Sequence, residues 1–76
     1  MSVKAYILAN VEAGMGEGVI EALSATEGVK SAHNVTGPYD VIALVEVSDT
    51  AALGELVVND IQLIDGIDYT LTCVAM

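Results

Sequence analysis

The sequence predicts an α+β fold with the element order strand, helix, strand, strand, helix, strand. Three observations support this order: four runs rich in β-branched residues, two segments with apolar residues at helical spacing, and a five-residue turn at residues 36–40. The strands are expected at residues 3–10, 29–36, 40–47 and 67–74. A βαββαβ order is that of the ferredoxin-like plan, one antiparallel four-stranded sheet with both helices on one face.

The first strand is expected to be apolar on both faces, with Tyr6 and Leu8 on the face opposite Ile7. A glycine-rich connection then leads into the first helix. The apolar positions of this helix are spaced by three and four residues and are Met15, Val19, Ala22, Leu23 and Thr26. We expect Gly28 to cap its C-terminus, because glycine tolerates the left-handed conformation found at many helix ends.

The second and third strands are expected to form an antiparallel hairpin, because the link between them is short. Ser48 or Asp49 is predicted to cap the N-terminus of the second helix. The apolar face of that helix consists of Leu53, Leu56, Val57, Ile61 and Ile64. A turn at Asp65 and Gly66 leads into the last strand.

The sheet is expected to have an apolar face that the helices do not cover. The third strand contains VIALV, which is apolar on both sides, and the last strand carries Leu71 and Cys73 on one face. We predict that the same sheet of a second copy covers this face in a twofold dimer. A single domain of 76 residues has a small core of its own, which also favours oligomerisation.

The net charge of −9 limits the classes of partner, since eleven acids face only Lys4 and Lys30. Nucleic acids and anionic membrane surfaces both require clustered basic residues, so we expect direct contact with neither. No apolar run reaches the roughly 20 residues of a membrane span, and no signal peptide is visible. A lone cysteine without an export signal favours a cytoplasmic location.

Several possible reactive sites have simpler explanations. Residues 14–18, GMGEG, follow a strand, but the dinucleotide fingerprint requires glycine where Val19 stands. His33 has Ser31 on the same strand face, yet nothing marks that hydroxyl as a nucleophile. Cys73 lies in an apolar strand and is expected to be a buried, inert thiol. The acids lack calcium-loop spacing, so we expect no metal, no cofactor and no enzyme activity.

The turn at residues 36–40 is the exception. Gly37 can adopt a positive φ, Pro38 fixes the next φ, and Asp40 places a carboxylate at the mouth of an apolar strand. The carboxylate of Asp40 can accept a hydrogen bond from the ammonium group of a ligand, and N–H groups of the turn can hold the carboxylate of the same ligand. Together they would suit an amino acid. Alternatively, Asp40 caps its own turn as an Asx motif.

The segment VKSAHNVTGPYDVIALVEV and the closing IDYTLTCVAM resemble the effector-binding domain of the Lrp/AsnC family, often called RAM. The most specific part is T-G-x-Y-D before an apolar strand. Full-length members carry an N-terminal helix-turn-helix, so the resemblance implies a stand-alone effector domain without DNA contact. It further implies sheet-to-sheet dimers that assemble into larger rings, with possible partners among full-length relatives.

The resemblance also implies a cleft between dimers, near the hairpin turn, that binds a small effector, commonly an amino acid. Asp40 would take the ammonium group and backbone N–H groups near Gly37 the carboxylate. The expected ligand-binding residues are Thr36, Gly37, Tyr39, Asp40, Thr70 and Thr72.

Two other functions are compatible with the βαββαβ order. One is a small enzyme of the dimeric α+β barrel type, for which His33 and the tyrosines are candidates and the absence of arginine is unfavourable. The other is an ACT-type amino-acid sensor, whose ligand would lie near Gly14 rather than near Gly37.

Overall fold

The predicted elements are all present and in the predicted order. The computed structural model describes residues 2–76. Its elements are β1 (Val3–Val11), α1 (Gly16–Ser24), β2 (Val29–Asn34), β3 (Val41–Val47), α2 (Thr50–Glu55), a π-helical segment η1 (Leu56–Ile61) and β4 (Ile67–Val74). Within the described residues, every helix is too short or too polar to cross a membrane.

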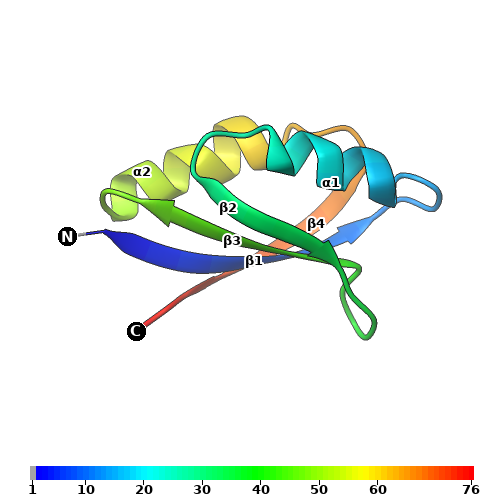
Figure 1. Cartoon of the computed structure of the whole chain (residues 1–76), viewed down its shortest axis with the longest axis horizontal. Coiled ribbons are helices and arrows are strands. Elements are labelled where there is room, and N and C mark those ends of the chain that lie inside the picture. Colours follow the sequence, from blue (N-terminus) through cyan, green and yellow to red (C-terminus); the bar gives the residue numbers. More distant parts are fainter. Residues whose placement is uncertain (1) are drawn as a thin grey trace.

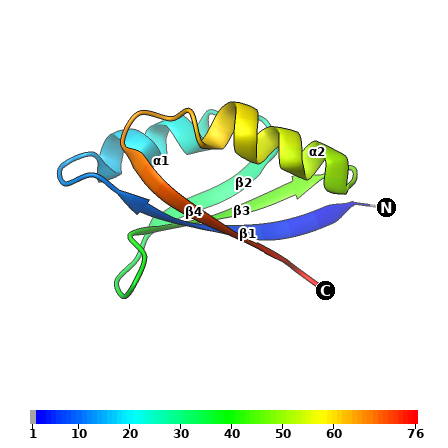
Figure 2. The same cartoon turned by 180° about the vertical axis from the view of Figure 1, so that it is seen from behind.

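The four strands form one open antiparallel sheet in the order β2-β3-β1-β4. Figures 1 and 2 show α1, α2 and η1 together on one face of this sheet. α1 connects β1 to β2, which have β3 between them. α2 and η1 connect β3 to β4, which have β1 between them. The ferredoxin-like fold expected from the element order is thereby confirmed.

The core lies between the helices and one face of the sheet. Ala5, Ile7 and Ala9 of β1 are buried there beside Val41, Ala43 and Val45 of β3. The helical layer covers them with Val19, Leu23, Leu53, Leu56, Val57 and Ile61. Alternation along each strand sends every second side chain to the opposite face. The chain thus buries one row of each central strand with its own residues.

The first helix ends earlier than its apolar spacing predicts. Its C-cap is Ala25, and the Thr26 hydroxyl donates a hydrogen bond of 2.8 Å to the Ala22 carbonyl. The expected capping role of Gly28 is therefore wrong. Gly28 has a φ of +96° before β2, and a Cβ there would lie 3.3 Å from Leu56 Cδ2. Glycine is needed at this position for the backbone conformation and for the close approach of Leu56 in η1.

The second helix begins as predicted, with Asp49 as the N-cap. Its carboxylate accepts a hydrogen bond of 2.8 Å from the Ala52 N–H. After Glu55 the helix widens, and the Gln62 N–H donates to the Val57 carbonyl five residues earlier. The apolar spacing did not predict this widening. The widening keeps the predicted apolar residues on the buried side, so the spacing carries no sign of it.

The face of the sheet opposite the helices is apolar and uncovered in the single chain. Tyr6 of β1 lies between Leu44 of β3 and Cys73 of β4. Tyr6, Tyr69 and Leu71 are 44%, 56% and 37% exposed. The prediction that the helices leave a second apolar face uncovered is confirmed.

Candidate functional site

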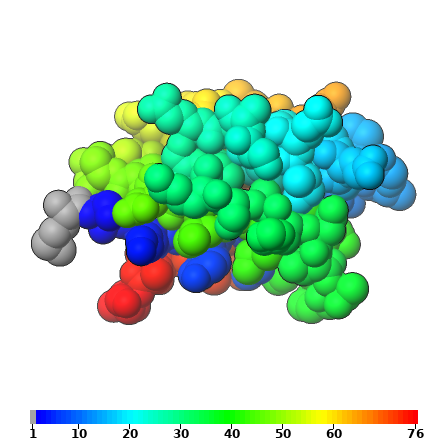
Figure 3. Space-filling view, in the orientation of Figure 1, coloured from blue at the N-terminus to red at the C-terminus, as the bar shows by residue number. Residues whose placement is uncertain are grey.

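The β2–β3 hairpin loop, residues 35–40, projects from one end of the sheet. In Figure 3 this green segment protrudes at the lower right, on the side away from the helices. The flanking strands are shorter than predicted, since β2 ends at Asn34 and β3 begins at Val41. Beyond the last ladder pair, Asn34 with Val41, the Val35 N–H donates to the Asp40 carbonyl at 2.9 Å and closes the loop. Gly37 has the expected positive φ, at +119°.

The end of β1 holds this loop by three hydrogen bonds. The Asp40 N–H donates to the Ala9 carbonyl at 2.9 Å. The Asn10 side-chain amide donates to the Pro38 carbonyl at 2.9 Å. The Val11 N–H donates to Asp40 Oδ2 at 3.0 Å. Three consecutive residues of β1 thus contact the loop and the residue that ends it.

The carboxylate of Asp40 completes the hydrogen bonding at the end of the sheet. The last β1–β3 pair is Ala9 with Val41, so Val11 lies beyond the ladder of β3. Oδ2 of Asp40 takes the place of the missing backbone acceptor for the Val11 N–H. The hydrogen bond of this carboxylate comes from the neighbouring strand and not from an Asx motif in its own turn. Asp40 itself is exposed, and within residues 2–76 its Oδ1 has no hydrogen-bond partner.

The two closing-strand threonines point toward the helical layer. Thr70 pairs with Ala9 and Thr72 with Ile7, and both partners belong to the buried face. The Thr70 hydroxyl accepts a hydrogen bond of 3.0 Å from the Gln62 side chain. The loop residues and the end of β1 are therefore brought together, while both threonines are half-buried beside the helices. Thr70 lies on β4, across β1 from the start of β3.

Asn10 was not among the predicted site residues, although its position in the sequence carries a signal. Asn10 is a polar residue at the end of an otherwise apolar strand. Asparagine is common next to turns because its amide can bond to nearby backbone groups. Its partner, Pro38, is 28 residues away, so the contact depends on the sheet order and not on local sequence.

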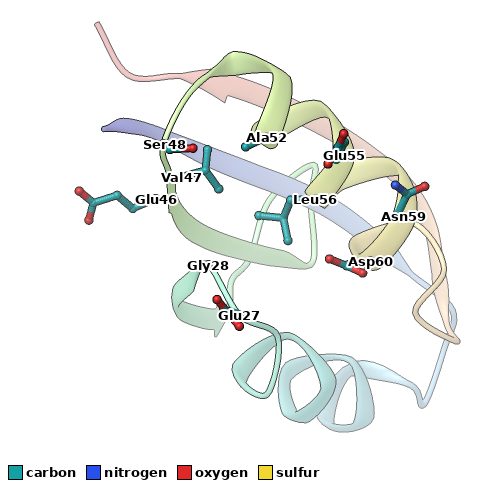
Figure 4. A pocket seen from close by; sticks show the side chains of 10 residues that line it. All are labelled: Glu27, Gly28, Glu46, Val47, Ser48, Ala52, Glu55, Leu56, Asn59 and Asp60. Carbon is teal, nitrogen blue, oxygen red and sulfur yellow. The ribbon is translucent and has the colours of Figure 1, made fainter. Parts of the chain in front are cut away.

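A groove lies elsewhere in the described structure, between the α1–β2 connection and α2 with η1. It has a volume of about 530 Å³, and Gly28 and Leu56 are among its lining residues. Figure 4 shows Glu27 and Asp60 beside this groove, whereas Glu46 points away from it. Carboxylates at its rim disfavour an anionic ligand. The hairpin loop lines neither this groove nor the smaller one beside it, of about 430 Å³.

Three side chains considered for other chemistry lie on the open face of the sheet or near it. His33 pairs with Ile42 and Ser31 with Leu44, so both belong to the open face of β2. Cys73 is exposed in the single chain, which contradicts the expected burial, because β4 is an edge strand and its odd positions face away from the helices. Within the described residues, His, Cys, Asp and Glu form no group that could hold a metal ion.

Comparison with known proteins agrees with this architecture. The sequence model of the Lrp/AsnC ligand binding domain matches residues 4–76. The crystal structure of FFRP-DM1 is 35% identical, with a TM-score of 0.93 over 97% of this chain and 99% of that one. Escherichia coli AsnC is 27% identical, with a TM-score of 0.91 over 97% of this chain and 50% of that one.

A third similar structure contains a ligand. The transcriptional regulator NMB0573 from Neisseria meningitidis, crystallised as a complex with L-Met, is 16% identical, with a TM-score of 0.87. The alignment covers 97% of this chain and 49% of that one, and at this identity the likeness is one of fold. Among curated proteins, none matches the chain.

These findings define the class as a regulatory ligand-binding domain with a ferredoxin-like fold. The chain belongs to the Lrp/AsnC family and corresponds to its ligand-binding domain over residues 4–76.

Proposed function

We propose that the chain is a cytoplasmic amino-acid sensor that works as an assembly of identical subunits. The observation that carries the proposal is Asp40, an exposed carboxylate with one oxygen fixed by the Val11 N–H and the other unpaired within residues 2–76. An exposed carboxylate held in place is a suitable acceptor for an ammonium group. Family membership supports a small-molecule ligand, and the L-Met complex of NMB0573 supports an amino acid.

The ligand would be held at both charged ends. Asp40 takes the ammonium group, and backbone N–H groups near Gly37 take the carboxylate, with Thr36 and Tyr39 lining the same loop. Thr70 and Thr72 face the helical layer, away from the loop, so their contact with the ligand stays a prediction from the family resemblance. The loop lines neither of the two grooves described above, and we propose that a neighbouring subunit closes the site. A sensor whose site lies between subunits couples ligand binding to assembly.

A second copy of the chain is the proposed cover of the open sheet face. The uncovered row contains Tyr6, Leu8, Ile42, Leu44 and Leu71. The family's assembly mode supports this pairing, and further contacts between dimers would close the hairpin site. The charge of −9 disfavours direct DNA contact, so regulation would proceed through partner proteins such as full-length relatives.

The first test is a thermal-shift panel of the twenty amino acids, followed by calorimetric titration. We expect at least one amino acid to raise the Tm of the wild type. Asp40→Asn keeps an acceptor for the Val11 N–H but removes the charge, so binding should weaken about 10- to 100-fold while the fold is retained. Asp40→Ala should weaken binding equally and also lower the free energy of unfolding by about 1 kcal/mol, because the Val11 N–H loses its acceptor.

Asp60→Asn is the matched control. It removes the same charge from the groove beside η1, and we expect unchanged affinity. Binding that is lost in Asp60→Asn but kept in Asp40→Asn would move the site to that groove and overturn the proposal.

A further inference from the structure

We propose that Asn10 is a positioning residue that fixes the Pro38–Tyr39 peptide so that the Tyr39 N–H binds the carboxylate of the ligand. This inference rests on the proposed amino-acid site and identifies the backbone donor within it. The observation behind it is the hydrogen bond of 2.9 Å from the Asn10 side-chain amide to the Pro38 carbonyl.

The contact fastens a part of the loop that nothing else holds. Val35 and Asp40 close the base of the loop through the backbone. Between them, the structure gives residues 36–39 a single hydrogen bond within the described chain, and it is the one from Asn10. Gly37 has open space around it and a φ of +119°. Pro38 has no N–H, so its carbonyl is the only backbone group by which it can be held by hydrogen bonding.

The chemistry of this bond requires a donor on β1. The partner is a carbonyl oxygen, which only accepts, so the Asn10 side chain must present its NH₂ group. Asn10 is half-buried and sits at the end of β1, paired with Tyr69 of β4. Asn10 is therefore paired on the β4 side, while on the β3 side Ala9 forms the last ladder pair and Asn10 is free to reach the loop. A residue on a paired strand positions a group more accurately than a loop can.

Peptide geometry transmits this contact to the ligand side. A trans peptide is planar, and its C=O and N–H groups point in opposite directions. The Pro38 carbonyl is directed at Asn10, so the Tyr39 N–H points away from β1. Within residues 2–76 this N–H has no hydrogen-bond partner. An unpaired donor next to Asp40 is placed to bind the anionic end of a molecule whose cationic end meets the Asp40 carboxylate.

Asn10 thus lowers the conformational entropy that the loop loses when the ligand binds. Without it, the Pro38–Tyr39 peptide is free to rotate, and the Tyr39 N–H points toward the ligand for only part of the time. The affinity of a site falls in proportion to the population of its binding-competent state. Stability depends on this exposed contact only slightly, so affinity and stability separate in a variant.

The test compares wild type with Asn10→Ala, and uses Asn34→Ala at the end of β2 as the matched control. Backbone ¹⁵N relaxation of the unliganded protein comes first. We expect order parameters of about 0.85 for Gly37 and Tyr39 in wild type and in Asn34→Ala, and below about 0.6 in Asn10→Ala. Equal order in all three proteins, or a mobile loop in wild type, would overturn the inference.

The second measurement titrates each of the twenty amino acids while the Tyr39 amide signal is followed. Each amino acid that shifts this signal in wild type should bind Asn10→Ala about 3- to 10-fold more weakly. The Tm should fall by no more than about 4–8 °C. Unchanged affinity in Asn10→Ala contradicts the positioning role. If none of the twenty shifts the wild-type signal, the proposed function fails, and the relaxation result still decides whether Asn10 orders the loop.

Discussion

At the scale of single residues, Asp40 combines a structural and a proposed binding role. Its backbone N–H bonds to Ala9 and its carboxylate to the Val11 N–H, so it holds the end of β1 before any ligand arrives. Truncation to alanine removes both the charge and this support. The pair Asp40→Asn and Asp40→Ala separates them, because the amide oxygen of asparagine still accepts a hydrogen bond.

Glu46 allows a prediction on pH. The hydrogen bond from the Ser2 hydroxyl, together with Lys4 and Lys30, lowers the pKa of Glu46 from the ordinary value of a glutamate. A carboxyl group whose pKa is lower in the folded state than in the unfolded state stabilises the fold at a pH above its unfolded-state pKa. This contribution to stability is lost as the pH falls through the folded-state pKa. The Tm advantage of wild type over Glu46→Gln should therefore be present at about pH 6 and vanish by about pH 2.

Thermal unfolding followed by circular dichroism across this range measures the effect. Ser2→Ala removes the main cause of the shift, and it should reduce the pH dependence of the Tm difference. A difference between wild type and Glu46→Gln that stays constant with pH would contradict the assignment.

At the scale of elements, two glycines with positive φ differ in their surroundings. Gly66 has a φ of +100°, and a Cβ there would lie 2.7 Å from Met15 Cβ and 3.2 Å from Val19 Cγ2. Gly14 has a φ of +82° and nothing within 4 Å. The turn before β4 thus packs against the start of α1, whereas the connection after β1 is free on that side.

Gly14→Ala should lower the free energy of unfolding by about 1–2 kcal/mol, the penalty of a left-handed conformation alone. Gly66→Ala adds overpacking and should lower it by about 1–3 kcal/mol more. Urea unfolding curves of both variants measure the difference. Equal losses would mean that α1 moves away from the turn at little cost.

The elements were largely predictable because burial follows local periodicity. The buried side of the second helix, with Leu53, Val57 and Ile61, was predicted correctly, as was Asp49 as its N-cap. The π-helical widening and the true role of Gly28 were not, since both depend on how the helical layer approaches the strands. The positive φ of Gly37 was predicted from local sequence, whereas the contact from Asn10 depends on the sheet order. The ligand-binding role of the turn came from the family resemblance and stays a prediction.

At the scale of the whole molecule, the open sheet face determines the proposed assembly. Leu71→Asp places a carboxylate in this face and should convert the assembly into monomers, because an unpaired charge is costly to bury. Leu63→Asp is the control, since Leu63 lies in the turn after η1 and is 77% exposed. Light scattering after size-exclusion chromatography measures the masses. A wild-type monomer, or a Leu71→Asp variant of unchanged mass, would contradict the pairing of sheets.

The positions of the tyrosines have a spectroscopic consequence. The chain contains three tyrosines and no tryptophan, so its ultraviolet emission arises from tyrosine alone. Tyr6 and Tyr69 lie on the open sheet face, and Tyr39 lies in the hairpin loop. With Tyr39→Phe, the remaining emission reports the pairing of the sheets without a label. With both sheet tyrosines replaced by phenylalanine, the emission reports occupancy of the loop.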